Sequence, residues 1–273
     1  EIIIFTDTSV YSMQFVGPPF TFRVNLINES SGLISPKAAV TAPQGIYFMS
    51  YDNFYIYNGS VIKLNCDVLD YVFSDFNSEQ AFKINAFTNT KENEVGWFYP
   101  SASSSEIDRY VIYNYQDKVW YYGQLSRTAW LDSGVESYPQ ATASNSLFQH
   151  EVGFDDDGSP MTGVFIESSD FDIGDGNNFQ FIRRILPDVR FLQDPNNGSV
   201  NLIIKTRNNN GSSLSTKSTS EVKSDTGQLH IRARGRQAVL RLESNDDAAN
   251  DGNLSVGWRL GATRLDVKQD GRR

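Results

Sequence analysis

The sequence predicts an all-β protein, with partial β-propeller blades followed by a β-sandwich-like domain and one short connector helix. Short segments rich in Ile, Val, Tyr and Phe recur along the 273 residues and are separated by turn residues. Asn-Gly and Asp-Gly pairs, which favour the positive φ of tight hairpins, occur seven times. Parallel sheets would need helical crossovers, and the sequence offers a single persuasive helix, so we expect antiparallel sheets.

A loose repeat of aromatic hairpins occupies the first part of the chain. Residues 2–11, 45–57 and 109–121 each have the pattern of a strand, an Asp-containing turn and a second strand. The turn aspartates are 45 and then 65 residues apart, which fits propeller blades of about 40–50 residues that carry insertions. We therefore expect residues 1–152 to form β-propeller-like blades. Three visible units are too few to close a ring, so the missing blades would lie upstream or in another chain.

The helix is expected at Asp67 to Phe76. Its apolar residues follow the i, i+3, i+4, i+7 spacing of one helical face: Val68, Leu69, Val72, Phe73 and Phe76. A single apolar stripe is what packing against a sheet requires. We therefore interpret this helix as a connector rather than a partner-binding element.

Residues 153–273 lack the hairpin motif and predict a β-sandwich-like or jelly-roll-like domain. The strands are expected at residues 163–168, 179–192, 200–207, 228–234, 237–243, 254–260 and 263–268. Between them, residues 208–227 are rich in Asn, Ser, Thr and Lys and have little to bury. Loops this long are usually functional or mobile. This one is expected to be a flexible surface loop or an arm that orders against a neighbouring subunit.

The net charge of −9 is unevenly distributed. Residues 1–182 contain 8 Lys/Arg and 23 Asp/Glu, a net charge of −15, and residues 183–273 contain 16 and 10, a net charge of +6. Such asymmetry suggests opposed surfaces, either between domains or between copies in an assembly. Overall acidity argues against a dedicated duplex-DNA binder, because phosphate neutralisation needs clustered Lys and Arg.

Residue types exclude several classes of chemistry. Cys66 is the single cysteine, so there is no internal disulfide, and with His150 and His230 as the two histidines there is no His/Cys zinc centre. No nucleophile elbow, Walker A loop or dinucleotide fingerprint is present. We therefore expect no enzyme activity, no catalytic residue and no cofactor. No apolar run is long enough for a membrane helix, so no membrane insertion is expected.

The densest carboxylate groups are Asp155-Asp156-Asp157 and the set Asp170, Asp172 and Asp175. Hairpin turns use Asp for local hydrogen bonds to the backbone, which is the favoured interpretation. A calcium site remains open, although the spacing does not match an EF-hand loop.

Two charged sets are the candidate site residues. Arg232, Arg234 and Arg236 are two residues apart, so in a strand they would share one face. We expect this row to face an acidic surface, between subunits or between domains, in preference to DNA. The second set, Glu106, Asp108 and Arg109, is expected to form an ion-pair network inside a blade.

Several segments carry a family resemblance in combination. They are Phe5-Thr6-Asp7, residues 94–101 (EVGWFYPS), residues 105–115 (SEIDRYVIYNY), Val119-Trp120, residues 127–132 (RTAWLD), residues 171–176 (FDIGDG), residues 258–261 (WRLG) and residues 270–273 (DGRR). Together they resemble the C-terminal part of the tail-nozzle or DNA-stabilisation proteins, the head-to-tail connector proteins of short-tailed bacteriophages. The resemblance also fits a chain that begins at Glu1 inside an apolar run, as a piece of a longer protein or a processed product.

The resemblance implies a structural role in the virion tail. Such proteins form a ring, usually a hexamer, below the portal and an adaptor protein, with tail fibres or spikes as further neighbours. The ring retains packaged double-stranded DNA and conducts it during ejection. An acidic channel wall would let DNA slide, and we assign that wall to residues 1–182 as a hypothesis.

Two alternatives remain open. A carbohydrate-binding or receptor-binding tail adhesin would expose aromatic platforms beside polar loops. A propeller-type glycosidase needs two carboxylates that converge in a cleft about 5–9.5 Å apart.

Overall fold

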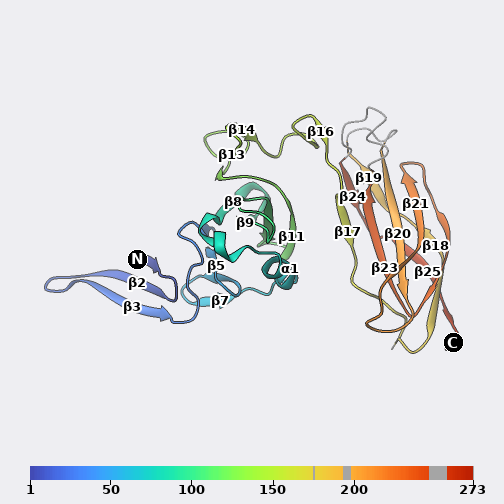
Figure 1. The fold of residues 1–273 in the computed structure, drawn as a ribbon, viewed down its shortest axis with the longest axis horizontal. Helices are drawn as coiled ribbons and strands as arrows, with labels where there is room; N and C mark the ends of the chain where they lie inside the picture. Colours follow the sequence, from blue (N-terminus) through green and yellow to red (C-terminus); the bar gives the residue numbers. More distant parts are fainter. Residues whose placement is uncertain (175, 193–197, 246–256, 273) are drawn as a thin grey trace. The chain divides into compact units, whose positions relative to one another are not determined.

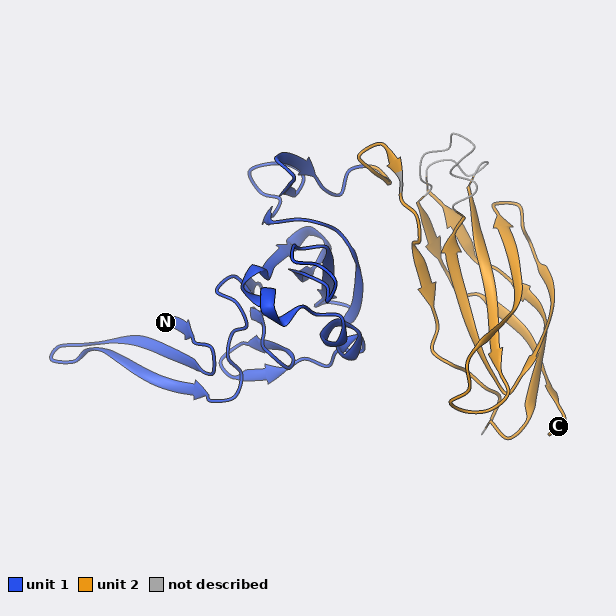
Figure 2. Cartoon of the chain, viewed as in Figure 1, with its two compact units in different colours: residues 1–152 blue, residues 153–273 orange. Residues whose placement is uncertain are grey.

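The computed structural model describes residues 1–174, 176–192, 198–245 and 257–272 (Figure 1). Strands account for 52% of the chain and helices for 6%, which confirms the all-β class. The chain divides into two compact units, residues 1–152 and residues 153–273 (Figure 2), and this is the division expected from the sequence. No helix in the described ranges has the length and apolar character needed to cross a membrane.

Unit 1 consists of small antiparallel sheets in which consecutive strands pair. The first sheet contains β1 (Ile2–Phe5), β2 (Val10–Gly17) and β3 (Thr21–Asn28). The second contains β4 (Ala39–Ala42), β5 (Gly45–Met49), β6 (Phe54–Tyr57) and β7 (Val61–Lys63). The third contains β8 (Asn85–Asn89), β9 (Glu94–Tyr99), β10 (Arg109–Asn114) and β11 (Val119–Gln124). The fourth contains β12 (Ala129–Leu131), β13 (Gln140–Ala143) and β14 (Ser146–Gln149).

The two four-stranded sheets have the up-and-down strand order of a propeller blade, but the predicted repeat was aligned wrongly. Residues 45–57 form the second and third strands of their sheet, whereas residues 109–121 form the third and fourth strands of theirs. Residues 2–11 begin a three-stranded sheet instead. The error has a physical cause, because every aromatic hairpin with a polar turn has the same local pattern, wherever it lies in a sheet.

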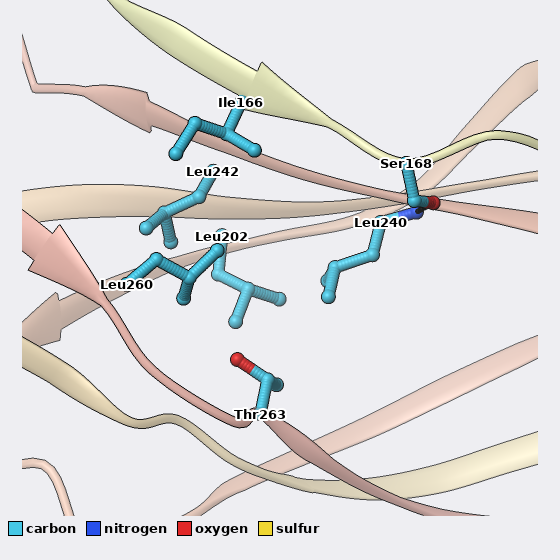
Figure 3. A pocket seen from close by; sticks show the side chains of 7 residues that line it. All are labelled: Ile166, Ser168, Leu202, Leu240, Leu242, Leu260 and Thr263. Carbon is cyan, nitrogen blue, oxygen red and sulfur yellow. Dashed lines mark hydrogen bonds between the residues drawn. The ribbon is translucent and has the colours of Figure 1, made fainter. Parts of the chain in front are cut away.

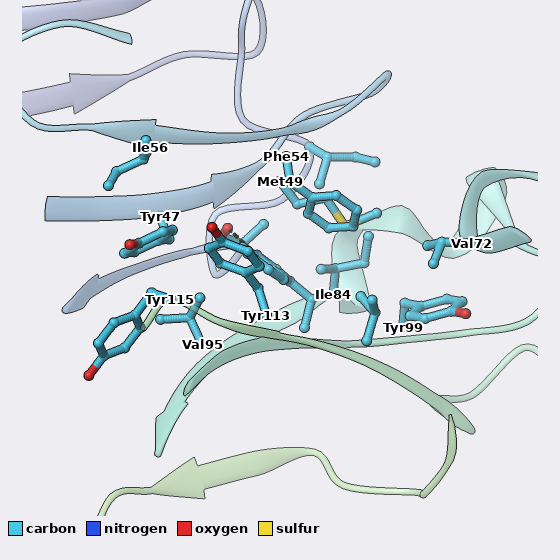
Figure 4. Close-up of a cluster of buried hydrophobic side chains, with 14 residues drawn as sticks. Tyr47, Met49, Phe54, Ile56, Val72, Ile84, Val95, Tyr99, Tyr113 and Tyr115 are labelled. Atoms are coloured by element: carbon cyan, nitrogen blue, oxygen red, sulfur yellow. Dashed lines mark hydrogen bonds between the residues drawn. The ribbon is translucent and has the colours of Figure 1, made fainter. Parts of the chain in front are cut away.

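An aromatic core joins the two four-stranded sheets (Figure 4). Tyr47 and Phe54 come from one sheet, and Trp97 and Tyr113 come from the other. The rings of Phe54 and Trp97 lie 4.7 Å apart between centroids, within the range of favourable ring pairs. The inward faces of both sheets are therefore buried against each other.

The predicted connector helix is confirmed in a shorter form, α1 (Leu69–Ser74). Val72 is fully buried in the aromatic core, and the other four residues of the predicted face pack against the same core. Two 3₁₀ turns, η1 (Ser78–Lys83) and η2 (Thr90–Glu92), complete the helical content of unit 1. The apolar stripe thus serves packing, as expected.

Unit 2 is a β-sandwich preceded by the short hairpin of β15 (Asp155–Asp156) and β16 (Ser159–Pro160). One sheet has the order β17 (Phe165–Glu167), β23 (Gln237–Ser244), β20 (Ser199–Arg207) and β21 (Ser215–Lys223). The other has the order β22 (Leu229–Gly235), β18 (Phe179–Leu186) and β25 (Arg264–Asp270). A further pair, β19 (Val189–Phe191) and β24 (Trp258–Leu260), extends from the β18–β25 end.

The core between the two sheets contains aliphatic side chains from both, among them Ile182, Ile231, Leu202 and Leu242. The predicted strands 163–168, 179–192, 200–207, 228–234, 237–243 and 263–268 are confirmed, with 179–192 split into β18 and β19. Of the predicted strand at 254–260, residues 254–256 lie outside the described residues, and the rest contains β24.

The expected long polar loop at residues 208–227 is wrong for its central part. Nine of these 20 residues form the strand β21, which pairs along its length with β20, and shorter loops remain at 208–214 and 224–227. Its side chains are mainly Ser, Thr, Lys and Glu, and Val222 is its one buried apolar residue. Because β21 is an edge strand, one buried side chain and the ladder of main-chain hydrogen bonds are enough to hold it. The polar composition of this segment therefore did not reveal that its central part is a strand.

Candidate functional site

The basic row predicted in β22 lies on the outer face of the three-stranded sheet of unit 2. Ile231 and Ala233 are buried, and Arg232 and Arg234 between them are exposed. This alternation is the period-two pattern of a strand that is buried on one face only. The two arginines therefore point away from the core on the same side of the sheet.

Neighbouring strands extend this surface. Across the ladder, Arg234 is opposite Phe181 and then Lys268, and His230 is opposite Arg184 and then Asp266. Together the outward-facing cations make what we term the basic face: Arg183, Arg184, Arg232, Arg234, Arg264 and Lys268. The residues from β18 and β25 were missed in the sequence, although Arg264, Asp266, Lys268 and Asp270 are spaced two apart. Strand pairing brings them beside β22, and spacing alone does not reveal that pairing.

Two aspartates neutralise part of the basic face. Asp266 accepts a hydrogen bond from Arg183 Nε at 2.7 Å and lies 3.7 Å from Arg184 Nη2. The hydrogen bond from Arg183 lowers the pKa of the Asp266 carboxyl. Arg234 Nε donates to Asp270 at 2.5 Å, and its guanidinium lies 4.0 Å from the centre of the Phe179 ring. Arg234 is thus held by an ion pair and a cation–π contact.

Three cations of the basic face have no such partners. The side chains of Arg232, Arg264 and Lys268 make no ion pair or hydrogen bond with the residues that the structure describes, and all three are exposed. The six cations also outnumber the two aspartates. This face therefore presents an uncompensated positive charge to its surroundings.

The third residue of the predicted row, Arg236, is half-buried and follows the end of β22 at Gly235. Its guanidinium donates to the main-chain oxygens of Asn177 and, at 2.9 Å, of Arg272. It also lies 4.8 Å from the centre of the Phe179 ring, the same ring that Arg234 contacts. Arg236 therefore lies next to Arg234 and ties the strand end to two loops, but it is less exposed than the other two arginines of the row.

The opposite sheet of the sandwich has a balanced outer surface. Lys205 pairs with Glu167 at 2.6 Å, and Arg241 pairs with Glu243 at 2.6 Å and with Glu167 at 3.3 Å. Arg207 pairs with Asp170. Both sheets belong to one unit, so the basic face stands out as the surface with the larger excess of cations over carboxylates.

Counting charges by structural unit corrects the sequence division. The boundary at residues 182/183 falls inside β18, so the segment of net charge +6 is not a separate body. Unit 1 contains 8 Lys/Arg and 16 Asp/Glu, a net charge of −8, and unit 2 contains 16 and 17, a net charge of −1. The net negative charge therefore belongs mainly to unit 1, and the basic face is a local excess of cations within a nearly neutral unit 2.

The predicted network in unit 1 forms in part. Arg109 Nη1 lies 3.0 Å from Asp108 Oδ2, and Arg109 Nε lies 3.4 Å from Asp75 Oδ2. Asp108 also accepts from the Ser101 main-chain N–H at 2.7 Å. Glu106 lies apart and pairs with Lys83 at 2.6 Å. The Asp75 contact was missed, because its carboxylate comes from the end of α1, far away in the sequence.

The Asp groups behave as turn and ion-pair residues. Asp155 accepts from the Gly158 N–H at 2.8 Å, and Asp156 and Asp157 are exposed. Asp170 pairs with Arg207, and Asp175 lies outside the described residues. Among the described residues, no group of three or more His, Cys, Asp or Glu side chains is arranged to hold a metal ion.

Unit 1 contains two carboxylates, Glu94 and Glu151, that share one buried amide as a hydrogen-bond donor. Asn89 Nδ2 donates to Glu94 Oε2 at 3.3 Å and to Glu151 Oε1 at 3.5 Å, and Tyr121 donates to the other oxygen of Glu94. Burial raises the pKa of Glu94 and of Glu151, and each has a second carboxylate nearby that adds to the rise. The Asn89 amide lies between the two carboxylates, and Asn89 is only 2% exposed.

A small cavity lies inside the sandwich of unit 2 (Figure 3). Its volume is about 100 Å³, and its lining is mostly leucine and isoleucine, with Ser168 and Thr263 as the polar residues. Ligand pockets usually measure about 300–1,000 Å³. The cavity is therefore a packing void between the sheets and too small for a sugar or nucleotide.

Comparisons with known proteins do not identify a family for this chain. No protein-family model matches the chain. No curated protein is significantly similar to it. The candidate site is therefore described by its residues alone.

Proposed function

We propose that this chain is a structural subunit of a bacteriophage virion, a tail-nozzle or DNA-stabilisation component whose copies assemble into a ring around the DNA path. The proposal has the sequence resemblance as its starting point. The expected ring is a hexamer beneath an adaptor protein, with fibres or spikes as further neighbours. The ring would retain double-stranded DNA and conduct it during ejection.

The basic face of unit 2 is the observation that carries the proposal. Arg232 and Arg264 are exposed and make no ion pair with described residues, whereas Lys205, Arg207 and Arg241 of the opposite sheet are all paired. Unit 1 of the same chain has a net charge of −8. Oppositely charged surfaces on one chain favour head-to-tail contacts between copies, and such contacts close into rings.

The packing of both units suits a structural role. The core of unit 1 is built from interlocked aromatic rings, and the core of unit 2 from aliphatic side chains of two sheets. The cavity between the two sheets of unit 2 measures only about 100 Å³. Rigid packing of this kind maintains subunit shape, which is what a channel wall requires.

The glycosidase alternative has one candidate pair, Glu94 and Glu151, and its surroundings do not favour catalysis. In a glycosidase the sugar lies between the two carboxylates. Here that position is filled by the buried side-chain amide of Asn89. The pair is therefore better explained as a hydrogen-bonded link between β9 and the segment after β14.

The test is the mass of the purified chain in solution, measured for two charge-reversal variants. We expect the wild-type chain to form a closed oligomer of a single mass. Arg232→Glu with Arg264→Glu should abolish it, because repulsion from acidic unit 1 would replace attraction. Lys217→Glu is the control, since Lys217 is an exposed cation on β21, away from the basic face.

Three results would contradict the proposal. A wild-type chain that stays monomeric at all concentrations would remove the ring. An oligomer that tolerates the double charge reversal would remove the basic face as its contact. Specific binding to a glycan array would favour the adhesin alternative instead.

A further inference from the structure

The sheet of β1, β2 and β3 has one face that is almost entirely apolar. Cross-strand pairing aligns Met13 with Ile2 and Val24, and Phe15 with Phe22. The Phe15 and Phe22 rings are in contact, with their centroids 5.8 Å apart in an edge-to-face arrangement. We call this surface the arm face: Ile2, Met13, Phe15, Phe22, Val24 and Leu26.

The opposite face of the same sheet is of a different kind. Near its base, Ile3, Phe5 and Ile27 pack against the sheet of β4 to β7. Farther out along β2 and β3, Gln14 is opposite Arg23, and both are exposed. This opposite face is therefore buried at its base against the rest of unit 1, and nearer the tip it carries the polar pair Gln14 and Arg23. The arm face, in contrast, is not packed against any other part of unit 1 that the structure describes.

The exposed area of the arm is large. Phe15 is 70% exposed, Phe22 52%, and Phe20 at the hairpin tip 80%. These three rings leave on the order of 400 Å² open to solvent, before the exposed aliphatic side chains Ile2, Val24 and Leu26 are counted. The largest apolar patches of monomers measure about 300–600 Å², and a stable interface buries about 800 Å² on each partner. With those side chains added, the exposed apolar surface of the arm is comparable to what one partner contributes to a small stable interface.

The strand edges argue against lipid as the partner. β1 pairs with β2 as far as Met13, so Gln14–Gly17 of β2 pair only with β3, and β3 pairs only with β2 among the described strands. Open edges carry unpaired N–H and C=O groups, which hydrocarbon does not tolerate. A protein surface that covers one face leaves those edges in water.

The charge pattern favours a second copy of the same surface. Residues 1–28 contain three charged side chains, Glu1, Asp7 and Arg23. Arg23 lies opposite Gln14 on the polar face, and Glu1 accepts a hydrogen bond from Gln14. Two arm faces can therefore meet without placing like charges against each other, and each is apolar along its whole length.

We propose that the arm face packs against the arm face of a second copy of this chain, with the two sheets stacked about 10 Å apart. Such a contact is isologous and joins copies two by two. It uses β1 to β3 of unit 1 and no residue of the basic face. It therefore does not depend on the proposed function.

The test uses full-length chains and a tagged partner, and every chain, including the one called wild type below, carries Arg232→Glu and Arg264→Glu, so that the contact proposed for the basic face does not contribute. We expect Phe22→Thr with Val24→Thr to weaken self-association by at least ~10-fold, because such anchors dominate interface energies. Gln14→Thr with Arg23→Thr is the matched control: it alters the same two strands on the polar face and should leave the association unchanged. Circular dichroism on every variant verifies that the chain is folded.

A capture experiment identifies the surface that receives the arm. Tagged wild-type chain should capture untagged wild-type chain, and the tagged Phe22→Thr/Val24→Thr variant should not. If that variant still captures wild-type chain, the arm packs on another surface of the second copy and the proposal is wrong. Flotation of wild-type chain with phosphatidylcholine–phosphatidylglycerol vesicles, lost in the variant, would also overturn it in favour of lipid.

Discussion

The indole nitrogen of Trp97 donates a hydrogen bond to the main-chain oxygen of Ala38 at 2.9 Å, and both residues are fully buried. Trp97 is in β9 and Ala38 immediately precedes β4, so this bond joins the two four-stranded sheets of unit 1. The same carbonyl accepts from the Met49 N–H at 3.1 Å. One indole thus provides both ring packing and a polar link between the sheets.

Replacing this indole should separate the two contributions. Trp97→Phe keeps an aromatic ring but loses the hydrogen bond, and should lower the free energy of unfolding by about 1–3 kcal/mol. Trp97→Ala also leaves a cavity and should cost about 3–5 kcal/mol. Chemical denaturation followed by circular dichroism measures both. A Trp97→Phe variant as stable as the wild type would show that the bond to Ala38 contributes nothing.

Gly96 tests how closely the third sheet packs. A Cβ at this position would lie 2.4 Å from Cζ of Phe87, and Phe87 is itself buried against Phe98. Gly96→Ala should therefore destabilise the protein by about 1–3 kcal/mol through overpacking. Gly134→Ala is the control, since a Cβ at that position meets nothing within 4 Å. A neutral Gly96→Ala in thermal denaturation would contradict the described packing.

Glu94 and Glu151 predict a dependence of stability on pH. Burial raises the pKa of both carboxyls in the folded protein above the ordinary value of 4.5. The folded state then binds protons more tightly than the unfolded chain, so their contribution to stability is full below pH 4.5 and falls as pH rises from there through the raised values. Two neighbouring charges also act on these carboxyls. Glu92 raises the pKa of both Glu94 and Glu151, whereas Lys91 lowers the pKa of Glu151.

The Glu151→Gln variant should reduce the loss of stability that accompanies rising pH. Its side chain keeps an oxygen that accepts from Asn89 but cannot ionise. Its melting temperature should match that of the wild type near pH 4 and exceed it at pH 7. Glu29→Gln, at an exposed glutamate outside the pair, should show no such divergence. A Glu151→Gln difference that stays constant with pH would contradict the assignment.

Arg232 and Arg234 should differ in their effects on folding. Arg234→Ala removes an ion pair with Asp270 and a cation–π contact with Phe179, and should cost about 1 kcal/mol. Arg232→Ala removes no ion pair, side-chain hydrogen bond or cation–π contact with a described residue and should stay within about 0.5 kcal/mol of the wild type. Thermal denaturation compares them. A larger loss for Arg232→Ala would mean that it has a structural role within the unit.

The features that the sequence predicted correctly are those that depend on residues close together in the chain. The apolar stripe around Val72 predicted a packed helix, and alternation of Ile231 and Ala233 with the arginines predicted a half-buried strand. Both features depend on residues a few positions apart. The structure bears out each of them.

The features that were missed depend on contacts between distant segments. β21 was interpreted as a loop because its strand character comes from pairing with β20 and not from its own composition. Asp75 reaches Arg109 only because α1 folds back on the sheet. The arm face has the same alternation that a buried sheet would have, so sequence could not show that it is uncovered.

Cryo-electron microscopy of virions whose genome encodes this chain tests the central claim most directly. We predict density for this fold in the tail, as a closed ring around the DNA path, with the basic face of each unit 2 against the acidic unit 1 of its neighbour. Particles that lack the chain, or that contain it away from the channel as isolated copies, would contradict the account.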